Sequence, residues 1–177
     1  MGIFAKLKNG YLIIVLGVVG IMYYNISRRL DYFEDRLDLA TGTLSLQMYE
    51  SIEHWSDSFN VPKYIAYNVA YQETGYRGPF HFNYNPYQKS FAGAVGPMQI
   101  ITRWAHPYVN RRLSEKELKT NIDLNVKISM QMLRKWYQIH GDWTLACGAY
   151  NSGSPIRNDY AVYASSNKDY KSKWLKL

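Results

Sequence analysis

Apolar side chains return every three or four residues from residue 44 onward, which is the spacing of one face of an α-helix. This spacing predicts long helices over 44–59, 60–75, 120–137 and 143–150. No stretch alternates apolar and polar residues for long enough to form a long strand, and only 80–91 has room for a small β-hairpin. The pattern therefore predicts a mainly α fold.

Helix-capping residues mark the expected boundaries. Asn60 is placed to cap the second helix, which ends at Gly75. Ser114, with a glutamate three residues later, forms a capping box for a further short helix. Thr120 opens the next long helix and Asp142 caps the last one.

An apolar segment precedes these helices. Residues 10–26 carry no charged side chain and reach about 25 Å as a helix, near the short end of the range that spans a bilayer. A cleavable signal peptide is the alternative, but Tyr23 and Tyr24 stand where signal peptidase needs small residues. Lys6 also departs from the myristoylation pattern. We therefore expect a short tail at 1–9 and a transmembrane anchor in the lipid membrane.

Residues 27–43 join the anchor to the helical domain that we expect over 44–177. They are acidic, and their apolar residues form a narrow helical stripe. The stripe fits a solvated linker helix packed on its own domain, or a stalk that dimerises. Basic residues flank both ends of the anchor, with a small excess before it. That excess favours a domain that lies outside the cytoplasm.

Composition narrows the function classes. The chain has 177 residues, 47% of them hydrophobic, and the single Cys147 excludes an internal disulfide and a Cys-rich zinc site. The net charge of +7 divides into +4 over 1–29, −6 over 30–57 and +9 over 58–177. The basic residues are scattered, so we expect no nucleic-acid partner. The four histidines lack metal-ligand spacing, and nothing in the sequence indicates a metal or another cofactor.

Glu73 is the candidate for acid–base chemistry. It is the only acid within 58–114, it ends an apolar helix, and it leads into a long loop over 75–96. Burial of a carboxyl group raises its pKa, which suits a general acid for cleavage of a glycosidic bond. The same stretch holds twelve aromatic residues interleaved with amide and hydroxyl side chains. Aromatic rings can cover the apolar faces of sugar rings, while amides and hydroxyls can form hydrogen bonds at their rims. The alternative is a plain ion pair between Glu73 and Arg77.

Three motifs then follow one another along the chain. The first is 60–75, NVPKYIAYNVAYQETG; the second is 93–99, GAVGPMQ, with Ser90 three residues before it; the third is 149–153, AYNSG. In this order they resemble the soluble lytic transglycosylase and goose-type lysozyme family. There the first stretch carries the catalytic glutamate, the second reads Gly-Ala-x-Gly-Leu-Met-Gln and the third reads Ala-Tyr-Asn-Ala-Gly. The resemblance extends over about residues 44–160.

The resemblance implies a lysozyme-like helical domain and peptidoglycan as its partner. The expected reaction cleaves the β-1,4 bond between N-acetylmuramic acid and N-acetylglucosamine. Glu73 would act first as acid and then as base, and the product would carry a 1,6-anhydro ring. The same resemblance implies five substrate-binding residues: Ser90, Met98, Gln99, Tyr150 and Asn151.

Core packing is the alternative role for Met98, and closing of the helix turn is the alternative for Tyr150 and Asn151. The chain also departs from the family pattern. The loop after Glu73 is several residues longer than usual, which predicts an extra wall for the substrate groove. Asn125 stands where the family usually has glycine, in the helix that begins at Asn121 and Ile122.

Other functions stay open at this stage. A goose-type muramidase would hydrolyse the same bond, and Asp123, Asp142 or Asp159 would have to fold back as its second carboxylate. A membrane-anchored structural protein would bind peptidoglycan without cutting it. A small anchored enzyme suits a bacterial machine that crosses the envelope, and it equally suits a phage, including one whose virion has a membrane.

Overall fold

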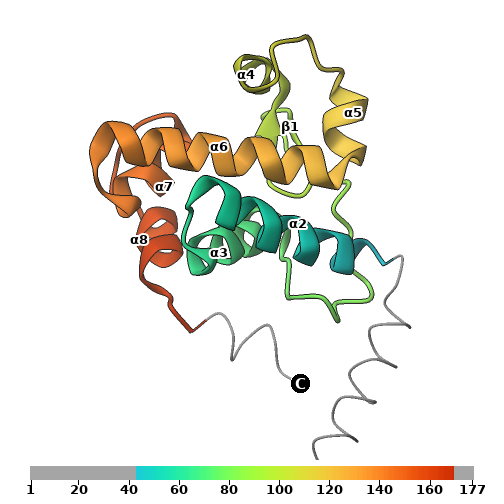
Figure 1. The fold of residues 1–177 in the computed structure, drawn as a ribbon, viewed down its shortest axis with the longest axis horizontal. Helices are drawn as coiled ribbons and strands as arrows, with labels where there is room; N and C mark the ends of the chain where they lie inside the picture. Colours follow the sequence, from blue (N-terminus) through green and yellow to red (C-terminus); the bar gives the residue numbers. More distant parts are fainter. Residues whose placement is uncertain (1–42, 170–177) are drawn as a thin grey trace, which may run out of the picture. The chain divides into compact units, whose positions relative to one another are not determined.

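The computed structural model describes residues 43–169, and helices form most of this part (Figure 1). Two strands of two residues each make a small sheet beside them. The elements are α2 (Leu44–Phe59), α3 (Lys63–Thr74), β1 (Ala94–Val95), β2 (Ile100–Ile101), α4 (Thr102–Ala105), η1 (His106–Tyr108), α5 (Glu115–Thr120), α6 (Ile122–His140), α7 (Trp143–Ser152) and α8 (Asp159–Ser166).

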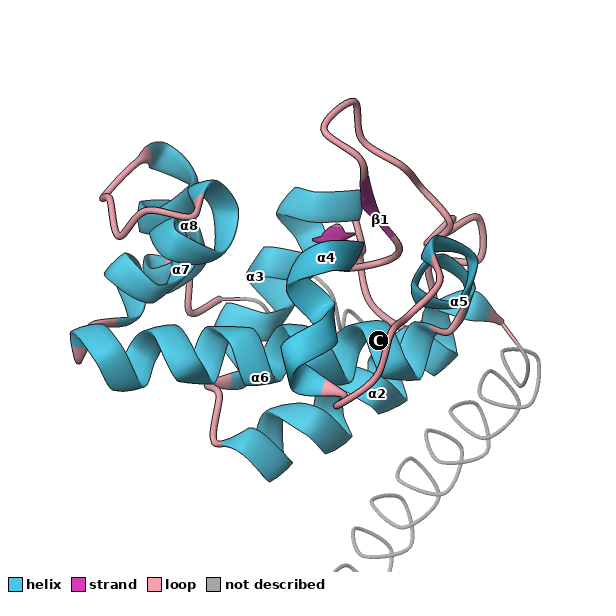
Figure 2. Ribbon diagram, turned by 90° about the horizontal axis from the view of Figure 1, so that it is seen from above, coloured by secondary structure: helices cyan, strands magenta, loops and turns pink. Residues whose placement is uncertain are grey.

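The longest helix, α6, is the centre of the packing. It contacts mainly α2 and α7, while α8 packs against α7 and α3 (Figures 1 and 2). The predicted apolar face of α6 is buried, since Val126, Met130 and Leu133 are wholly inaccessible to solvent. Met48 and Ile52 from α2 join the same core. Burial of this stripe holds the helices together.

The predicted hairpin over 80–91 is wrong. The two strands lie further along the chain, where Ala94 pairs with Ile101 and Val95 pairs with Ile100 in antiparallel register. Residues 80–91 instead form turns and open loop, with one isolated bridge from Lys89 to Val95. The physical reason is that one proline, Pro86, and two asparagines interrupt 80–91, whereas the glycine-containing connection between the two strands reverses the chain tightly.

Two helix starts also differ from expectation. Asn60 does not cap α3; it ends α2 in the left-handed conformation, with φ of 52°, which asparagine tolerates better than most residues. Pro62 occupies the start of α3. Asn121, rather than Thr120, caps α6 through a bond from the Leu124 amide. Helix α8, which the spacing did not predict, begins at the Asn158 cap.

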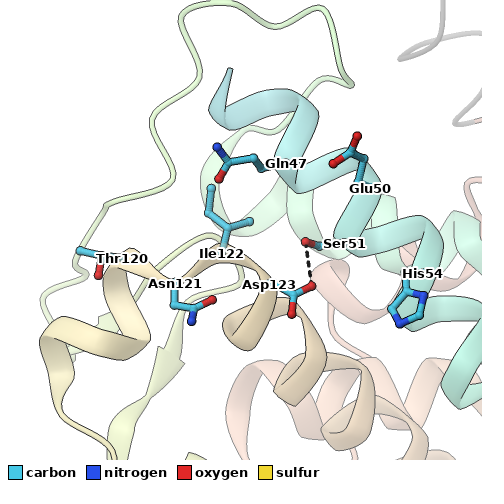
Figure 3. Close-up of a pocket in the computed structure, with 8 residues that line it drawn as sticks. All are labelled: Gln47, Glu50, Ser51, His54, Thr120, Asn121, Ile122 and Asp123. Carbon is cyan, nitrogen blue, oxygen red and sulfur yellow. Dashed lines mark hydrogen bonds between the residues drawn. The ribbon is translucent and has the colours of Figure 1, made fainter. Parts of the chain in front are cut away.

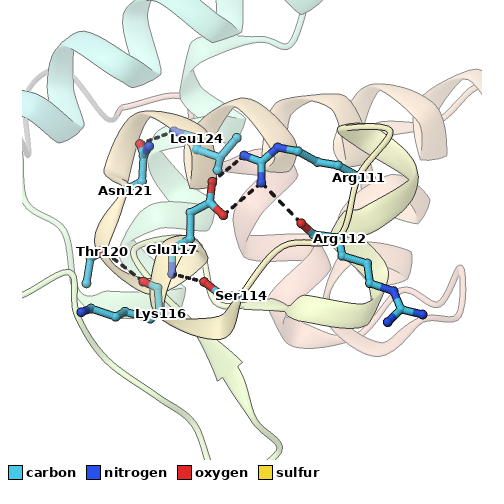
Figure 4. Close-up of polar contacts among 8 residues, drawn as sticks. All are labelled: Arg111, Arg112, Ser114, Lys116, Glu117, Thr120, Asn121 and Leu124. Atoms are coloured by element: carbon cyan, nitrogen blue, oxygen red, sulfur yellow. Dashed lines mark hydrogen bonds and ion pairs between the residues drawn. The ribbon is translucent and has the colours of Figure 1, made fainter.

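The capping predicted for α5 is present. The hydroxyl of Ser114 accepts a hydrogen bond from the Glu117 amide at 3.0 Å (Figure 4). The Glu117 carboxylate pairs with the Arg111 guanidinium instead of returning to the start of the helix. This arrangement fixes α5 directly before α6.

The predicted tail, anchor and stalk over 1–42 lie outside the described residues. Within 43–169, no helix has both the length and the apolar character to cross a bilayer.

Candidate functional site

Glu73 lies near the C-terminal end of α3, and its side chain is mostly buried. Burial raises the pKa of this carboxyl group to about 7, while a hydrogen bond from Tyr160 acts in the opposite direction. Among residues 43–169 Glu73 forms no ion pair, and Arg77 is exposed. The side chain can therefore hold its proton near neutrality, as a general acid must.

The partner of Glu73 comes from a distant part of the chain. The Tyr160 hydroxyl in the first turn of α8 donates to Oε1 of Glu73 at 2.5 Å. Gln72, the neighbour of Glu73, donates from Nε2 to the Tyr160 carbonyl at 3.0 Å. Burial, and then the charge of Glu73, raise the pKa of Tyr160 far above its usual value. Tyr160 thus stays protonated and orients one carboxylate oxygen.

A cavity of about 350 Å³ opens in front of Glu73. It brings together residues from α3, the long loop, β2, α4, α6 and α7. Five residues predicted from the sequence line it together: Glu73, Ser90, Gln99, Tyr150 and Asn151. Ala92 and Ala94 continue the wall that Ser90 begins, so the end of the long loop forms one side of the cavity.

Met98, the sixth predicted residue, does not line this cavity. Its side chain is wholly inaccessible and belongs to the hydrophobic core. The next residue, Gln99, takes a left-handed conformation with φ of 49°, and it is Gln99 that lines the cavity. Core packing is therefore the role of the Met98 side chain in this structure.

The backbone beside Met98 is tied to the site. The Tyr150 hydroxyl donates to the Met98 carbonyl at 2.6 Å. The Thr74 hydroxyl, next to Glu73, donates to the Pro97 carbonyl at 2.8 Å. These two bonds join α3 and α7 to the turn that precedes Gln99. The cavity wall is thus fixed by the same helices that carry Glu73 and Tyr150.

Aromatic side chains extend the cavity. Trp104 lines it with 40% of its surface exposed. The same residue also lines an adjoining cavity of about 220 Å³, together with Tyr108 and Trp136. Met132 and Tyr150 border both cavities, so the two lie side by side. Flat aromatic faces beside polar groups suit a chain of sugar rings.

None of the three aspartates considered as a second carboxylate lines the Glu73 cavity. Asp123 lies in a separate cavity of about 560 Å³ between α2 and α6, where it accepts bonds from Ser51 and Trp55 (Figure 3). Asp142 caps α7 and pairs with Arg157 at 2.6 Å. Asp159 begins α8 and is exposed. Among residues 43–169, Glu73 is the one carboxylate at its cavity.

No group of three or more His, Cys, Asp or Glu side chains within 43–169 could hold a metal ion. Cys147 is buried in α7, and burial raises the pKa of its thiol to about 12. A thiol with that pKa is a poor nucleophile at neutral pH.

Sequence reasoning missed two residues of the site, Tyr160 and Trp104. Helix α8 is short and rich in small residues, so the sequence shows no apolar stripe there. Its signal was Asn158, which is a good helix cap and does accept a bond from the Ala161 amide. Trp104 follows the second motif by five residues, but nothing in the sequence distinguished it from a core aromatic.

Comparison with known proteins adds one finding. A family model described as the transglycosylase SLT domain matches residues 50–173, which include every residue that lines the Glu73 cavity. No curated protein and no solved structure matches the chain.

Proposed function

The chain belongs to the transglycosylase SLT domain family, and we propose that it is a lytic transglycosylase that cuts peptidoglycan without using water. The observation that carries this proposal is a single, mostly buried carboxyl group, Glu73, in a cavity with no second carboxylate among the described residues. Paired-carboxylate glycosidases need two such groups at a defined separation.

In the first step Glu73 acts as the acid. It gives its proton to the leaving oxygen of the β-1,4 bond between N-acetylmuramic acid and N-acetylglucosamine, and the C1–O4 bond breaks. The carbonyl oxygen of the substrate's own N-acetyl group bonds to C1 in place of an enzyme nucleophile. The pKa of about 7 supports this role, because much of Glu73 is protonated near neutral pH.

In the second step the ionised Glu73 acts as the base. It takes the proton of the C6 hydroxyl, whose oxygen bonds to C1 as the bond from the N-acetyl oxygen breaks. The product carries a 1,6-anhydro ring and Glu73 regains its proton. Tyr160 stabilises the ionised carboxylate between the two steps through its 2.5 Å hydrogen bond.

The cavity walls support a glycan substrate. The Ser90 hydroxyl accepts a bond from the Ala94 amide, which leaves its hydrogen for a ligand. Asn151 and Gln99 present amides at the cavity, and Trp104 offers a partly exposed ring. The adjoining cavity on the other side of Trp104 offers room for further sugars.

We place the enzyme at a membrane through the uncharged segment 10–26, with the catalytic domain facing the cell wall. The setting is local opening of the bacterial wall, either by an envelope-spanning machine or by a phage whose virion carries the protein, including one with its own membrane. The support for the anchor is the apolar sequence itself.

Mass spectrometry of digested peptidoglycan tests the reaction. We expect 1,6-anhydromuramic ends from the wild-type protein and none from Glu73→Gln, which keeps the size of the side chain but removes the proton. Reducing ends would instead identify a muramidase. If the Glu73→Gln variant degraded the wall as much as the wild type, both the transglycosylase and the muramidase function would be overturned. Binding of peptidoglycan without cleavage would then be the remaining function.

A further inference from the structure

A buried amide in α6 lies against the turn that ends in Gln99. Asn125 is wholly inaccessible to solvent. Its Nδ2 donates to the Val95 carbonyl and to the Leu118 carbonyl, both at 3.0 Å. Its Oδ1 accepts from the Met98 amide, also at 3.0 Å. One acceptor and two donors are thus used together, a set that a carboxylate or a single hydroxyl does not offer.

The Met98 peptide is therefore held on both sides. Asn125 accepts from its N–H, and Tyr150 donates to its C=O at 2.6 Å. Ser129 closes the network, because its hydroxyl lies 3.1 Å from that of Tyr150 and 2.8 Å from the Asn125 carbonyl. Buried polar groups that are all satisfied in this way rigidify the backbone they bind.

The next residue shows what this rigidity supports. Gln99 has φ of 49°, a left-handed conformation that is unfavourable for a residue with a side chain. Such a conformation persists where the surrounding structure over-determines it. Gln99 also donates from Nε2 to the Gly96 carbonyl at 2.9 Å, and it lines the cavity of Glu73.

The fit between Asn125 and the turn is close. A Cβ atom at Gly96 would lie 2.4 Å from Nδ2 of Asn125 and 2.8 Å from the Leu118 carbonyl. The absence of a side chain at Gly96 therefore lets the Asn125 amide pack directly against the backbone of the turn. The two residues form one unit across the interface between α6 and the cavity wall.

We infer that Asn125 is a positioning residue of the site, which acts through the Met98 peptide to hold Gln99 at the cavity wall. The functional part of this inference rests on the proposed function, since it requires Gln99 to contact the glycan. The structural part, that Asn125 fixes the Met98 peptide, does not depend on any substrate.

Hydrogen exchange of the full-length protein tests the structural part. In Asn125→Ala, the Met98 amide should exchange at least tenfold faster relative to the Ile128 amide, which lies in the core of α6. Asn125→Asp keeps an acceptor for Met98 but loses both donors and places a carboxyl group against two carbonyl oxygens, so it should restore little of this protection. An unchanged ratio of the two exchange rates in Asn125→Ala would overturn the inference, whether or not the protein cuts peptidoglycan.

Kinetics on soluble glycan strands test the functional part. Asn125→Ala should raise KM about tenfold, while the pH midpoint set by Glu73 stays in place. Gln99→Ala on that background should add less than a further twofold, because both changes act on one contact. If the two substitutions instead raised KM by the product of their separate effects, Asn125 would not act through Gln99. Ile52→Val, a truncation in the core of α2, controls for lost stability and should leave KM unchanged.

An inactive wild-type protein would count against the proposed function, and the exchange ratio would still decide the role of Asn125.

Discussion

The Tyr160 hydroxyl donates to Oε1 of Glu73 at 2.5 Å, although the two residues are 87 positions apart in the chain. This bond favours the ionised form of Glu73 and lowers its pKa, against the larger effect of burial. Tyr160 therefore tunes the carboxyl group as well as orienting it.

Tyr160→Phe should shift the pH dependence of the enzyme. Loss of the bond raises the pKa of Glu73, so the midpoint at which kcat/KM falls with rising pH should move upward by about half a unit to one unit. The maximal rate should fall at the same time, because one carboxylate oxygen is no longer held. Tyr163→Phe is the matched control, because Tyr163 lies in the same helix as Tyr160 and keeps its ring against Tyr71 of α3. A midpoint that moves downward would contradict this account.

The raised pKa of Glu73 also predicts how stability changes with pH. Its pKa is about 7 in the folded protein against an ordinary value of 4.5, so the folded state binds the extra proton between these values. Stability should consequently fall as pH rises from about 4 to 8, by about 3 kcal/mol.

Glu73→Gln should remove that loss, which is measurable as the difference in unfolding free energy between the two proteins. The variant should match the wild type near pH 4 and exceed it near pH 8. Parallel stability curves over this range would show that Glu73 ionises normally.

Trp104→Ala should weaken glycan binding about tenfold, because Trp104 borders both of the adjoining cavities with 40% of its surface exposed. Binding of glycan strands is best measured by calorimetry on the Glu73→Gln background, where no cleavage occurs. Phe82 is a matched control, since it is 51% exposed and lines neither cavity. If Phe82→Ala lowered affinity as much as Trp104→Ala, the binding surface would not be the one described.

Asp159→Asn and Asp123→Asn should each leave kcat within about twofold of the wild type, since surface changes away from a site have small effects. Asp159 is exposed at the start of α8, and Asp123 lies in the other cavity. The measurement is the initial rate of release of soluble muropeptides. A loss of a hundredfold or more in either variant would indicate a second catalytic carboxylate and a hydrolytic mechanism.

Binding to intact peptidoglycan should weaken as salt rises through about 0.1–0.5 M, because residues 58–177 carry a net charge of +9. Arg103 lies 5.6 Å from the Trp104 ring and thus beside the cavity, so Arg103→Gln should reduce the salt dependence. Lys89→Gln is a suitable comparison, because Lys89 is already paired with Glu115. Affinity that does not change with salt would mean that charge does not hold the wall.

The position of Glu73 could be predicted from its local setting, at the end of an apolar helix and before a long loop. Gln99 and Tyr150 were predicted only because the motifs over 93–99 and 149–153 resemble those of the family. Helix caps and glycines depend on near neighbours, so they can be interpreted from a short stretch of chain. Met98 had core packing as its alternative role, and its buried side chain takes that alternative. Consecutive residues in a turn point in different directions, so only the packing shows which one faces the cavity.

Long-range contacts were the part that the sequence did not reveal. Tyr160 reaches Glu73 only because α8 packs on α3 and α7, and no local pattern encodes that approach. The role of Asn125 was equally hidden, since the sequence does not show that this asparagine on the buried face of α6 has three backbone partners. The short strands escaped prediction because two residues are too few to alternate.

The bond between Tyr160 and Glu73 also bears on synthesis of the protein, because it joins two segments that the ribosome produces at different times. Asn68 of α3 bonds to the Asn167 carbonyl at the far end of α8, 99 positions later. Translation proceeds from the N-terminus, so Glu73 emerges long before the segment that orients it. A ribosome-bound chain that lacks α8 would therefore hold Glu73 without the hydroxyl that orients it, and this part of the site would be completed only after α8 has emerged.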